Sequence, residues 1–202
     1  AYITGDTTSD QTTFPCEIGP DVSHNSYGLY DAFVAKVSAT GMDLVYAGYI
    51  GGAGQDHGTG IGVDGAGNAY VTGFTTSDQS TFPERSGPDL VFNGDQDAFV
   101  AKVNADGTML DYAGYIGGMG QDAGYGIAVD SEGNAYVTGQ SDCGQSTFPD
   151  QDGPDVTFNG VRDAFVAKVT ADGTVLDYAG YIGGAGDDRG TDIAVDGTGN
   201  AY

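Results

Sequence analysis

Apolar residues alternate with small or polar residues in short runs along this chain, and stretches rich in glycine and aspartate separate the runs. In residues 164–169, Phe165, Ala167 and Val169 fall on one face at the two-residue period of a β-strand. Comparable short runs at residues 127–129, 135–138 and 176–182 predict three further strands. The pattern predicts an all-β fold with few helices.

Turn signals between the runs indicate how neighbouring strands connect. Asp130 to Asn134 reads as a hairpin turn, because Asp can bond its own backbone and Gly and Asn tolerate positive φ. A second tight turn is predicted at residues 171–174. Residues 75–96 are too long for a hairpin and predict an ordered surface loop pinned by Phe82 and Pro83.

The whole set of runs repeats. Asp-Ala-Phe-Val-Ala-Lys-Val begins at Asp31, Asp97 and Asp163, a step of 66 residues each time. Four antiparallel strands at a fixed period predict a propeller blade, so we expect a β-propeller-like array of three four-stranded blades. A parallel β-helix would show far shorter coils, and sandwich domains would need about 100 residues and seven strands per unit.

We expect one propeller-repeat region over residues 1–202. Repeat 1 covers about 1–58 and lacks its first strand, repeat 2 covers about 59–124, repeat 3 covers about 125–190, and residues 191–202 start a further blade. Three blades are too few to close a propeller, which typically has four to eight. Two hypotheses remain open: head-to-tail association of copies into a ring or filament, or a longer chain of which these blades are one part.

Composition narrows the classes of partner. The 202 residues include 6 Lys and Arg against 29 Asp and Glu, which gives a net charge of −23 and disfavours nucleic acid as a partner. No apolar run approaches the roughly 18 residues that a membrane helix needs, so no membrane insertion is expected. All but three of the acidic residues are Asp, the residue of turns and calcium loops.

The motif Gly-Gly-x-Gly-x-Asp occurs once per repeat and ends at Asp56, Asp122 and Asp188, with Asp187 beside the last. Glycine-rich loops expose carbonyl oxygens and these aspartates add anionic ligands, so Asp56, Asp122, Asp187 and Asp188 are candidate Ca²⁺ ligands. The alternative is a turn between blades in which Asp caps backbone amides. No other cofactor is expected.

Other recurring charges favour structural roles. Asp31, Asp97 and Asp163 are expected to cap turns, with metal ligation as the second interpretation. Asp64, Asp130 and Asp196 belong to the hairpin turns. Lys36, Lys102 and Lys168 hold one position per repeat, which predicts a fixed ion pair with a repeat aspartate.

Cysteine and histidine add little chemistry. Cys16 and Cys143 lie in the long loops of repeats 1 and 3, which become neighbours in a head-to-tail arrangement, so an intersubunit disulfide is one interpretation and two unpaired apolar side chains the other. His24 and His57 do not recur between repeats, and nothing marks a nucleophile elbow. We therefore expect no enzymatic activity.

The combination of Asp-Ala-Phe-Val-Ala-Lys, Tyr-Ile-Gly-Gly-x-Gly-x-Asp and the Phe-Pro loop resembles the SBBP β-propeller repeats of bacterial and archaeal surface and secreted proteins. The resemblance runs through all three repeats. It implies a propeller and an extracellular or cell-surface setting, and it carries no catalytic assignment.

Together these features predict a non-enzymatic extracellular structural or adhesive protein whose partners are copies of itself. The alternative is a ligand-binding propeller module of a larger secreted protein, with surface glycans, peptides or proteins as partners. An exported hydrolase is a third and weaker class.

Overall fold

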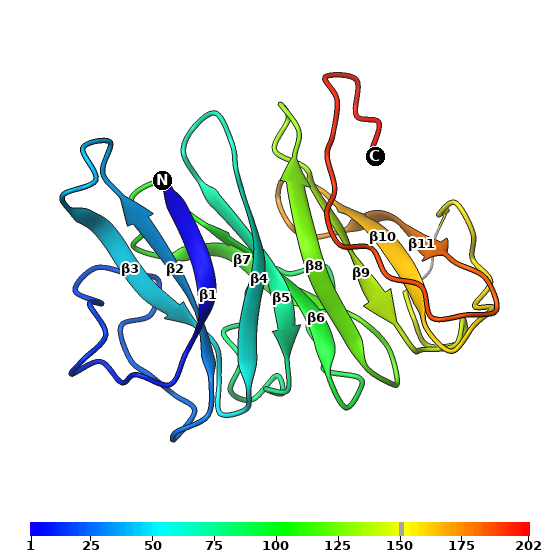
Figure 1. Cartoon of the computed structure of the whole chain (residues 1–202), viewed down its shortest axis with the longest axis horizontal. Helices are drawn as coiled ribbons and strands as arrows, with labels where there is room; N and C mark the ends of the chain where they lie inside the picture. The colour runs from blue at the N-terminus through cyan, green and yellow to red at the C-terminus, as the bar shows by residue number, and fades with distance from the viewer. Residues whose placement is uncertain (150–151) are drawn as a thin grey trace.

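The computed structural model describes residues 1–149 and 152–202. All the regular secondary structure in these residues is β-strand. The strands form three antiparallel sheets, numbered 1 to 3 along the chain, which stand side by side in Figure 1. Sheet 1 contains β1 (Tyr2–Thr7), β2 (Asp31–Val37) and β3 (Leu44–Ile50). Sheet 2 contains β4 (Asp56–Val63), β5 (Ala69–Thr75), β6 (Asp97–Val103) and β7 (Leu110–Ile116). Sheet 3 contains β8 (Asp122–Val129), β9 (Ala135–Ser141), β10 (Asp163–Val169) and β11 (Leu176–Ile182).

The predicted all-β, propeller-like array of blades is confirmed, and the three sheets do not close into a ring. Each complete sheet pairs its strands in sequence order, as a blade does. In the described residues sheet 1 has three strands, with β1 at one edge. None of the described residues forms a helix long and apolar enough to cross a membrane.

The strand starts differ from the sequence-based prediction in one respect. The first strand of blade 3 was predicted at residues 127–129, but β8 begins at Asp122, the last residue of the Gly-Gly-x-Gly-x-Asp motif. Glycines at positions 124 and 126 hide this strand from a hydrophobicity pattern, although their backbones pair with β9. The motif aspartate is therefore the first residue of a strand.

The hairpin turns form as their sequence predicts. Gly133 adopts φ 88° and donates its N–H to the carbonyl of Asp130 at 3.1 Å. Asn134 does not need positive φ, because its backbone N–H and side-chain amide both bond the Asp130 carboxylate. The turn between third and fourth strands also places a glycine at positive φ, at Gly41, Gly107 and Gly173.

The core lies between the sheets. We call the side of a sheet that looks toward the preceding sheet its front face and the opposite side its rear face. The rear face of sheet 1 and the front face of sheet 2 share one apolar cluster, which includes Val34, Tyr46, Val71 and Phe99. A second cluster joins the rear of sheet 2 to the front of sheet 3 and includes Phe165, Ala167 and Val169, the three residues predicted to share a face.

The long loop after the second strand lies against the front face of its own sheet, and Phe82 anchors it there. Phe82 packs on Phe99 and Tyr115, with ring centroids 5.5 and 5.1 Å apart. Phe14 and Phe148 make the same contacts in sheets 1 and 3. Part of this loop in repeat 3, at positions 150 and 151, lies outside the described residues.

The last residues differ from the expected strand. Residues 193–195 were predicted as the first strand of a further blade, but they form only a single bridge between Val195 and Ala201. Two backbone hydrogen bonds join Ala194 to Tyr202. The segment, red in Figure 1, runs past sheet 3 and turns back on itself, because no second strand lies beside it.

Candidate functional site

Each Gly-Gly-x-Gly-x-Asp loop follows the last strand of one sheet and leads toward the next blade, and we call this connection a corner. The aspartates of these loops cap backbone amides. The Oδ2 atoms of Asp56, Asp122 and Asp188 each accept the N–H of the second glycine of the motif at 2.8 Å. Asp56 also accepts hydroxyl bonds from Thr75 and Ser77. These three aspartates therefore cap backbone N–H groups of their own loops, as the second interpretation of the motif proposes.

Burial changes the acidity of two of these carboxyl groups. Asp56 and Asp122 are wholly buried, and the loss of hydration raises the pKa of each to about 6 despite their hydrogen bonds. Asp188 is partly exposed at the end of the array, and Asp187 is exposed, with one oxygen 3.9 Å from the guanidinium of Arg162. The four predicted metal ligands therefore lie in three separate corners.

Within residues 1–149 and 152–202, no group of three or more His, Cys, Asp or Glu side chains is gathered as a metal site would require. A calcium site here would need backbone carbonyl oxygens as further ligands. The prediction that Asp56, Asp122, Asp187 and Asp188 bind metal stays a prediction.

A second set of aspartates also recurs once per repeat. Asp31, Asp97 and Asp163, each the first residue of its strand, are wholly buried. Their Oδ2 atoms accept backbone N–H groups from Asn25, Asn93 and Asn159 at 2.8–2.9 Å, which is the predicted capping role. Burial, with the nearby charge of Asp122, raises the pKa of Asp97 to about 7.

The hairpin aspartates are structural, as expected. Asp130 accepts hydrogen bonds from the backbone of Glu132 and Asn134, from the Asn134 amide and from the Tyr136 hydroxyl. These bonds outweigh partial burial and lower the pKa of Asp130. Asp64 and Asp196 repeat the arrangement.

Among residues 1–149 and 152–202, the predicted ion pair of the repeat lysines is found for Lys168 and not for Lys36 or Lys102. Lys168 contacts Asp177 at 2.8 Å. Lys102 lies over the ring of Tyr70 at 5.0 Å, and Lys36 lies over Tyr2 at 5.1 Å and donates to the Ala105 carbonyl. The position is defined by a tyrosine ring on the neighbouring strand, and a sequence pattern of charges does not show that partner.

Both cysteines are free thiols. Cys143 is wholly buried, its Sγ donates to Asp122 at 2.9 Å, and burial raises the pKa of its thiol. Cys16 is partly exposed. The intersubunit disulfide stays a prediction, and the burial of Cys143 speaks against it because thiol exchange needs access.

Each of the two histidines lies beside one polar side chain. His57 Nδ1 lies 3.3 Å from Asp6, and its ring stacks on Phe74. His24 Nε2 lies 3.4 Å from the hydroxyl of Ser26, but Ser26 is wholly buried and cannot meet a substrate.

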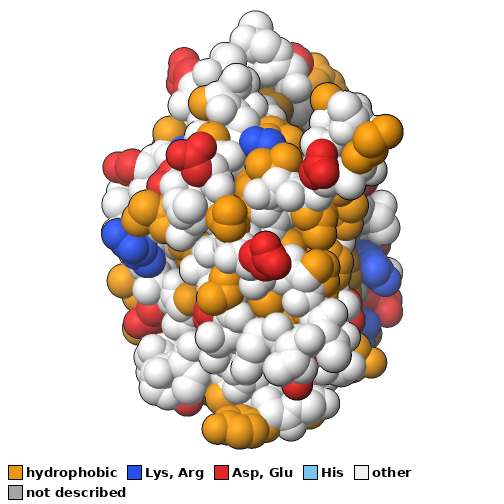
Figure 2. All heavy atoms as spheres, turned by 90° about the vertical axis from the view of Figure 1, so that its left-hand side faces the viewer, with side chains coloured by type: hydrophobic (Ala, Val, Ile, Leu, Met, Phe, Trp, Pro, Cys, Tyr) orange, Lys and Arg blue, Asp and Glu red, His pale blue; other side chains and the backbone are white. Residues whose placement is uncertain are grey.

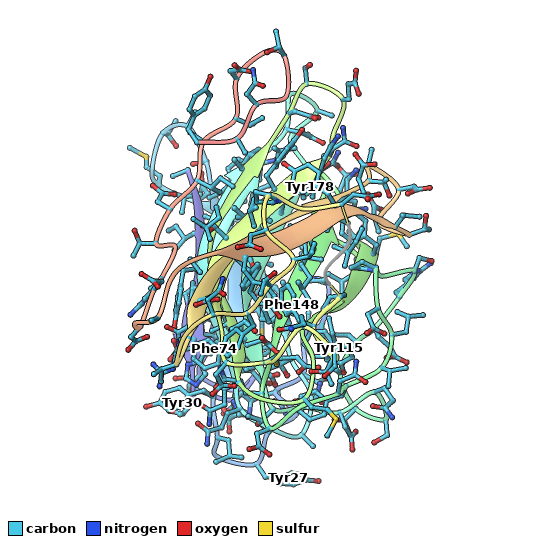
Figure 3. The ribbon with its side chains drawn as sticks, turned by 90° about the vertical axis from the view of Figure 1, so that its right-hand side faces the viewer. Tyr27, Tyr30, Phe74, Tyr115, Phe148 and Tyr178 are labelled. Carbon is cyan, nitrogen blue, oxygen red and sulfur yellow. The ribbon has the colours of Figure 1, made fainter. Side chains whose placement is uncertain are left out.

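The open ends of the array present the other candidate site. Between sheets, a turn glycine packs on a tyrosine of the preceding sheet: a Cβ on Gly107 would lie 2.1 Å from Tyr46 Cγ, and a Cβ on Gly173 would lie 2.2 Å from Tyr112 Cγ. Gly41, in the same turn of sheet 1, has nothing within 4 Å. Tyr178, equivalent to those tyrosines, is half-buried on the rear end face that Figure 3 shows.

Apolar side chains repeat this contrast. Ile182 is 56% exposed on sheet 3, whereas its equivalents Ile50 and Ile116 are 0% exposed. On the front of sheet 1, Leu44 is 45% exposed, whereas Leu110 and Leu176 are 8% and 9% exposed. Figure 2 shows hydrophobic side chains distributed over that front end face.

Sequence reasoning identified incomplete ends but not the side chains that would meet there. The signal was present: glycine recurs at positions 41, 107 and 173 and tyrosine at 46, 112 and 178. Only the packing shows that the tyrosine of one repeat contacts the glycine of the next.

Comparison with known proteins agrees with this architecture. The family model described as the beta-propeller repeat SBBP matches residues 45–78 and 111–142. Each match runs from the last strand of one sheet through the glycine-rich corner to the second strand of the next. No curated protein matches the chain. The chain therefore contains two segments that match the SBBP β-propeller repeat, and its antiparallel sheets of three and four strands are consistent with propeller blades.

Proposed function

We propose that this chain is a non-enzymatic structural module that associates head to tail with copies of itself. The observation that supports this proposal is that sheet 1 packs on sheet 2 in the same way as sheet 2 packs on sheet 3. The two exposed end faces of the array carry the two sides of that same interface. The rear face of sheet 3 repeats the rear faces of sheets 1 and 2, and the front face of sheet 1 repeats the front faces of sheets 2 and 3.

The first half of the interface is a tyrosine and a glycine. Tyr178 of one copy would rest on the turn at Gly41 of the next copy, as Tyr46 rests on Gly107 and Tyr112 on Gly173. Ile182 and Leu44 would become buried as their equivalents are. Each such burial stabilises a complex by about 1.5–3 kcal/mol before the entropic cost of association.

The second half is strand addition. Residues 188–195 already occupy the position of a first strand against sheet 3: Gly190 donates its N–H to Gly139 and lies against Thr138, as Gly124 lies against Thr72. The segment has no sheet of its own, and β1 has a free edge. In the register of β8 with β9, Ile193 would pair with Ile3 of the next copy and Val195 with its Ala1.

Ala201 and Tyr202 occupy the place where this pairing would form. Ala201 bridges Val195, as Ala135 pairs with Val129 in sheet 3, so it holds the place that Ala1 of a second copy would take. Association must displace Ala201 and Tyr202. Shortening the chain to Asn200 should therefore strengthen association.

The alternative is a ligand-binding propeller, and the recess on the end face is its most open candidate site. The recess of about 810 Å³ on the rear of sheet 3 is lined by Tyr178, Ile182 and Ile193. These residues are the ones that the next blade would cover, so we assign the recess to docking and not to a carbohydrate or peptide.

The extracellular or cell-surface setting is proposed on the SBBP resemblance and on the match to that repeat model. Labelling of intact cells with an antibody against the long loops would test it, and labelling only after lysis would contradict it.

The test of association is sedimentation velocity at rising protein concentration. Wild type should form species larger than 20.5 kDa. Gly41→Ala should weaken association, because its Cβ would meet Tyr178 of the partner. Gly65→Ser is the matched control, because Gly65 has nothing within 4 Å and lies in a hairpin away from both ends.

The chain ending at Asn200 should associate at lower concentration than wild type. Negative-stain images would then separate closed rings from filaments. A strictly monomeric protein in every variant up to millimolar concentration would overturn the proposal.

A further inference from the structure

In the part of the chain that the structure describes, buried carboxylate oxygens lack a hydrogen-bond partner in all three blade corners: Oδ1 of Asp31, of Asp97 and Asp122, and of Asp163. Asp97 is wholly buried, and its Oδ2 accepts the backbone N–H of Asn93 at 2.9 Å. Its Oδ1 has no hydrogen-bond partner among the described residues, and the same is true of Asp163 Oδ1. A buried acceptor without a donor costs about 1–3 kcal/mol, and more when it is charged, so this oxygen requires an explanation.

The unpartnered oxygen of Asp97 and two backbone carbonyl oxygens lie around the same glycine. A Cβ on Gly94 would lie 2.9 Å from Asp97 Oδ1, 2.6 Å from the Gly118 oxygen and 2.3 Å from the Gly120 oxygen. Three oxygens thus converge beside the bare Cα of Gly94. The Gly120 oxygen accepts N–H groups from Asp95 and Gln96, and no hydrogen bond to the Gly118 oxygen is found in the described part of the chain.

The same convergence recurs one repeat later. A Cβ on Gly160 would lie 2.8 Å from Asp163 Oδ1 and 2.5 Å from the oxygens of both Gly184 and Gly186. A carboxylate that faces carbonyl oxygens is repulsive unless a positive charge lies among them. Both corners therefore have the same unmet requirement.

A second carboxylate increases that requirement. A Cβ on Gly117 would lie 2.9 Å from Asp97 Oδ1 and 2.8 Å from Asp122 Oδ2, so both buried carboxylates border the same glycine. None of the three salt bridges among the described residues involves Asp97, Asp122 or Asp163. These two buried carboxyl groups have no protein cation beside them, so a bound cation or a proton must balance the charge that they carry.

We propose that each of these two corners binds a Ca²⁺ ion: Asp97 Oδ1 with the carbonyl oxygens of Gly118 and Gly120, and Asp163 Oδ1 with those of Gly184 and Gly186. Calcium takes six to eight oxygen ligands in flexible geometry, and carboxylate and backbone carbonyl oxygens are typical of its sites. Water would complete the shell, because Met119, between the two carbonyls, is 72% exposed.

The first corner should not bind the ion. Asn25 caps Asp31 as Asn93 caps Asp97, so Ser26 stands where repeats 2 and 3 have Gly94 and Gly160. Asp31 Oδ1 is unpartnered as well, but Ser26 is wholly buried and carries a side chain at the position where repeats 2 and 3 have a bare Cα. The inference therefore predicts two ions per chain, one fewer than the number of repeats.

The test is calorimetric titration of the chelator-treated chain with CaCl₂, together with thermal unfolding in CaCl₂ and in chelator. Wild type should bind two ions, Asp97→Asn one, and the double variant D97N/D163N none. Asp95→Asn, an exposed acid two residues from Asp97, is the matched control and should still bind two ions.

Asparagine at position 97 should not unfold the chain, because its amide can donate to the Gly118 carbonyl. Chelator should lower the melting temperature of wild type but not of D97N/D163N. No Ca²⁺ binding by wild type, or an unchanged stoichiometry in D97N, would overturn the proposal. It would also be overturned if a proton neutralises the corner: the melting temperature of wild type would then not change with CaCl₂, and D97N would melt at a higher temperature.

Discussion

Gly107 and Gly41 occupy the same turn in two blades and differ in whether a side chain of the preceding blade packs on them. Each donates its N–H to the residue three positions earlier, and their φ angles are +74° and +73°. Gly107 rests on the ring of Tyr46, whereas Gly41 faces solvent. Replacing each with alanine separates the cost of the backbone conformation from the cost of packing between blades.

The magnitudes follow from the geometry. Alanine at positive φ costs about 1 kcal/mol, and Gly41→Ala should show this cost alone. In Gly107→Ala the new Cβ would lie 2.1 Å from Tyr46 Cγ, and Tyr46, only 2% exposed, has little room to move. Overpacking of this kind costs about 1–3 kcal/mol, so Gly107→Ala should lose about 2–4 kcal/mol in total.

The assay is denaturant unfolding at a protein concentration below that of association, followed by far-ultraviolet circular dichroism. The midpoint should fall further for Gly107→Ala than for Gly41→Ala, with an unchanged m-value. Gly173→Ala, which faces Tyr112, should behave like Gly107→Ala. Equal losses in Gly41→Ala and Gly107→Ala would refute the reasoning that these tyrosine contacts hold the blades together.

Three further predictions concern single side chains. Burial raises the folded-state pKa of Asp56 to about 6, while its unfolded value is near 4, so Asp56 should lower the stability of the fold by about 3 kcal/mol as pH rises from 4 through 6. Asp56→Asn, measured in chelator, should show a flatter dependence of stability on pH. An equal slope in wild type and variant would count against this prediction. Asp130→Ala removes a carboxylate that accepts four hydrogen bonds and should cost about 2 kcal/mol in denaturant unfolding, while the exposed Asp106→Ala should change stability by less than about 0.5 kcal/mol. In the native protein iodoacetamide should modify Cys16 but not Cys143 until the chain unfolds, as mass spectrometry of digested protein would show; modification of both at the same rate would contradict the buried position of Cys143.

The sequence by itself determined the repeat, the strands and the turn chemistry. Alternating runs place Phe165, Ala167 and Val169 on one face, and the Asp-to-Asn turns need aspartate and glycine whatever surrounds them. These features are local, because a two-residue period and an aspartate bonded to its own backbone require no distant partner. The missing first strand of blade 1 also followed from counting repeat elements.

Only the tertiary structure decided which repeated residues meet. The lysine at position 102 lies over Tyr70 and not beside an aspartate, Gly107 contacts Tyr46 of the preceding blade, and Asp97 meets carbonyls from the corner after β7. Residues 193–195 failed to form the strand that their sequence favours, because a β-strand is stabilised by its neighbour and none lies beside it. Contacts between residues 20 to 60 positions apart depend on how the sheets stack, and the alternation within a strand carries no information about that stacking.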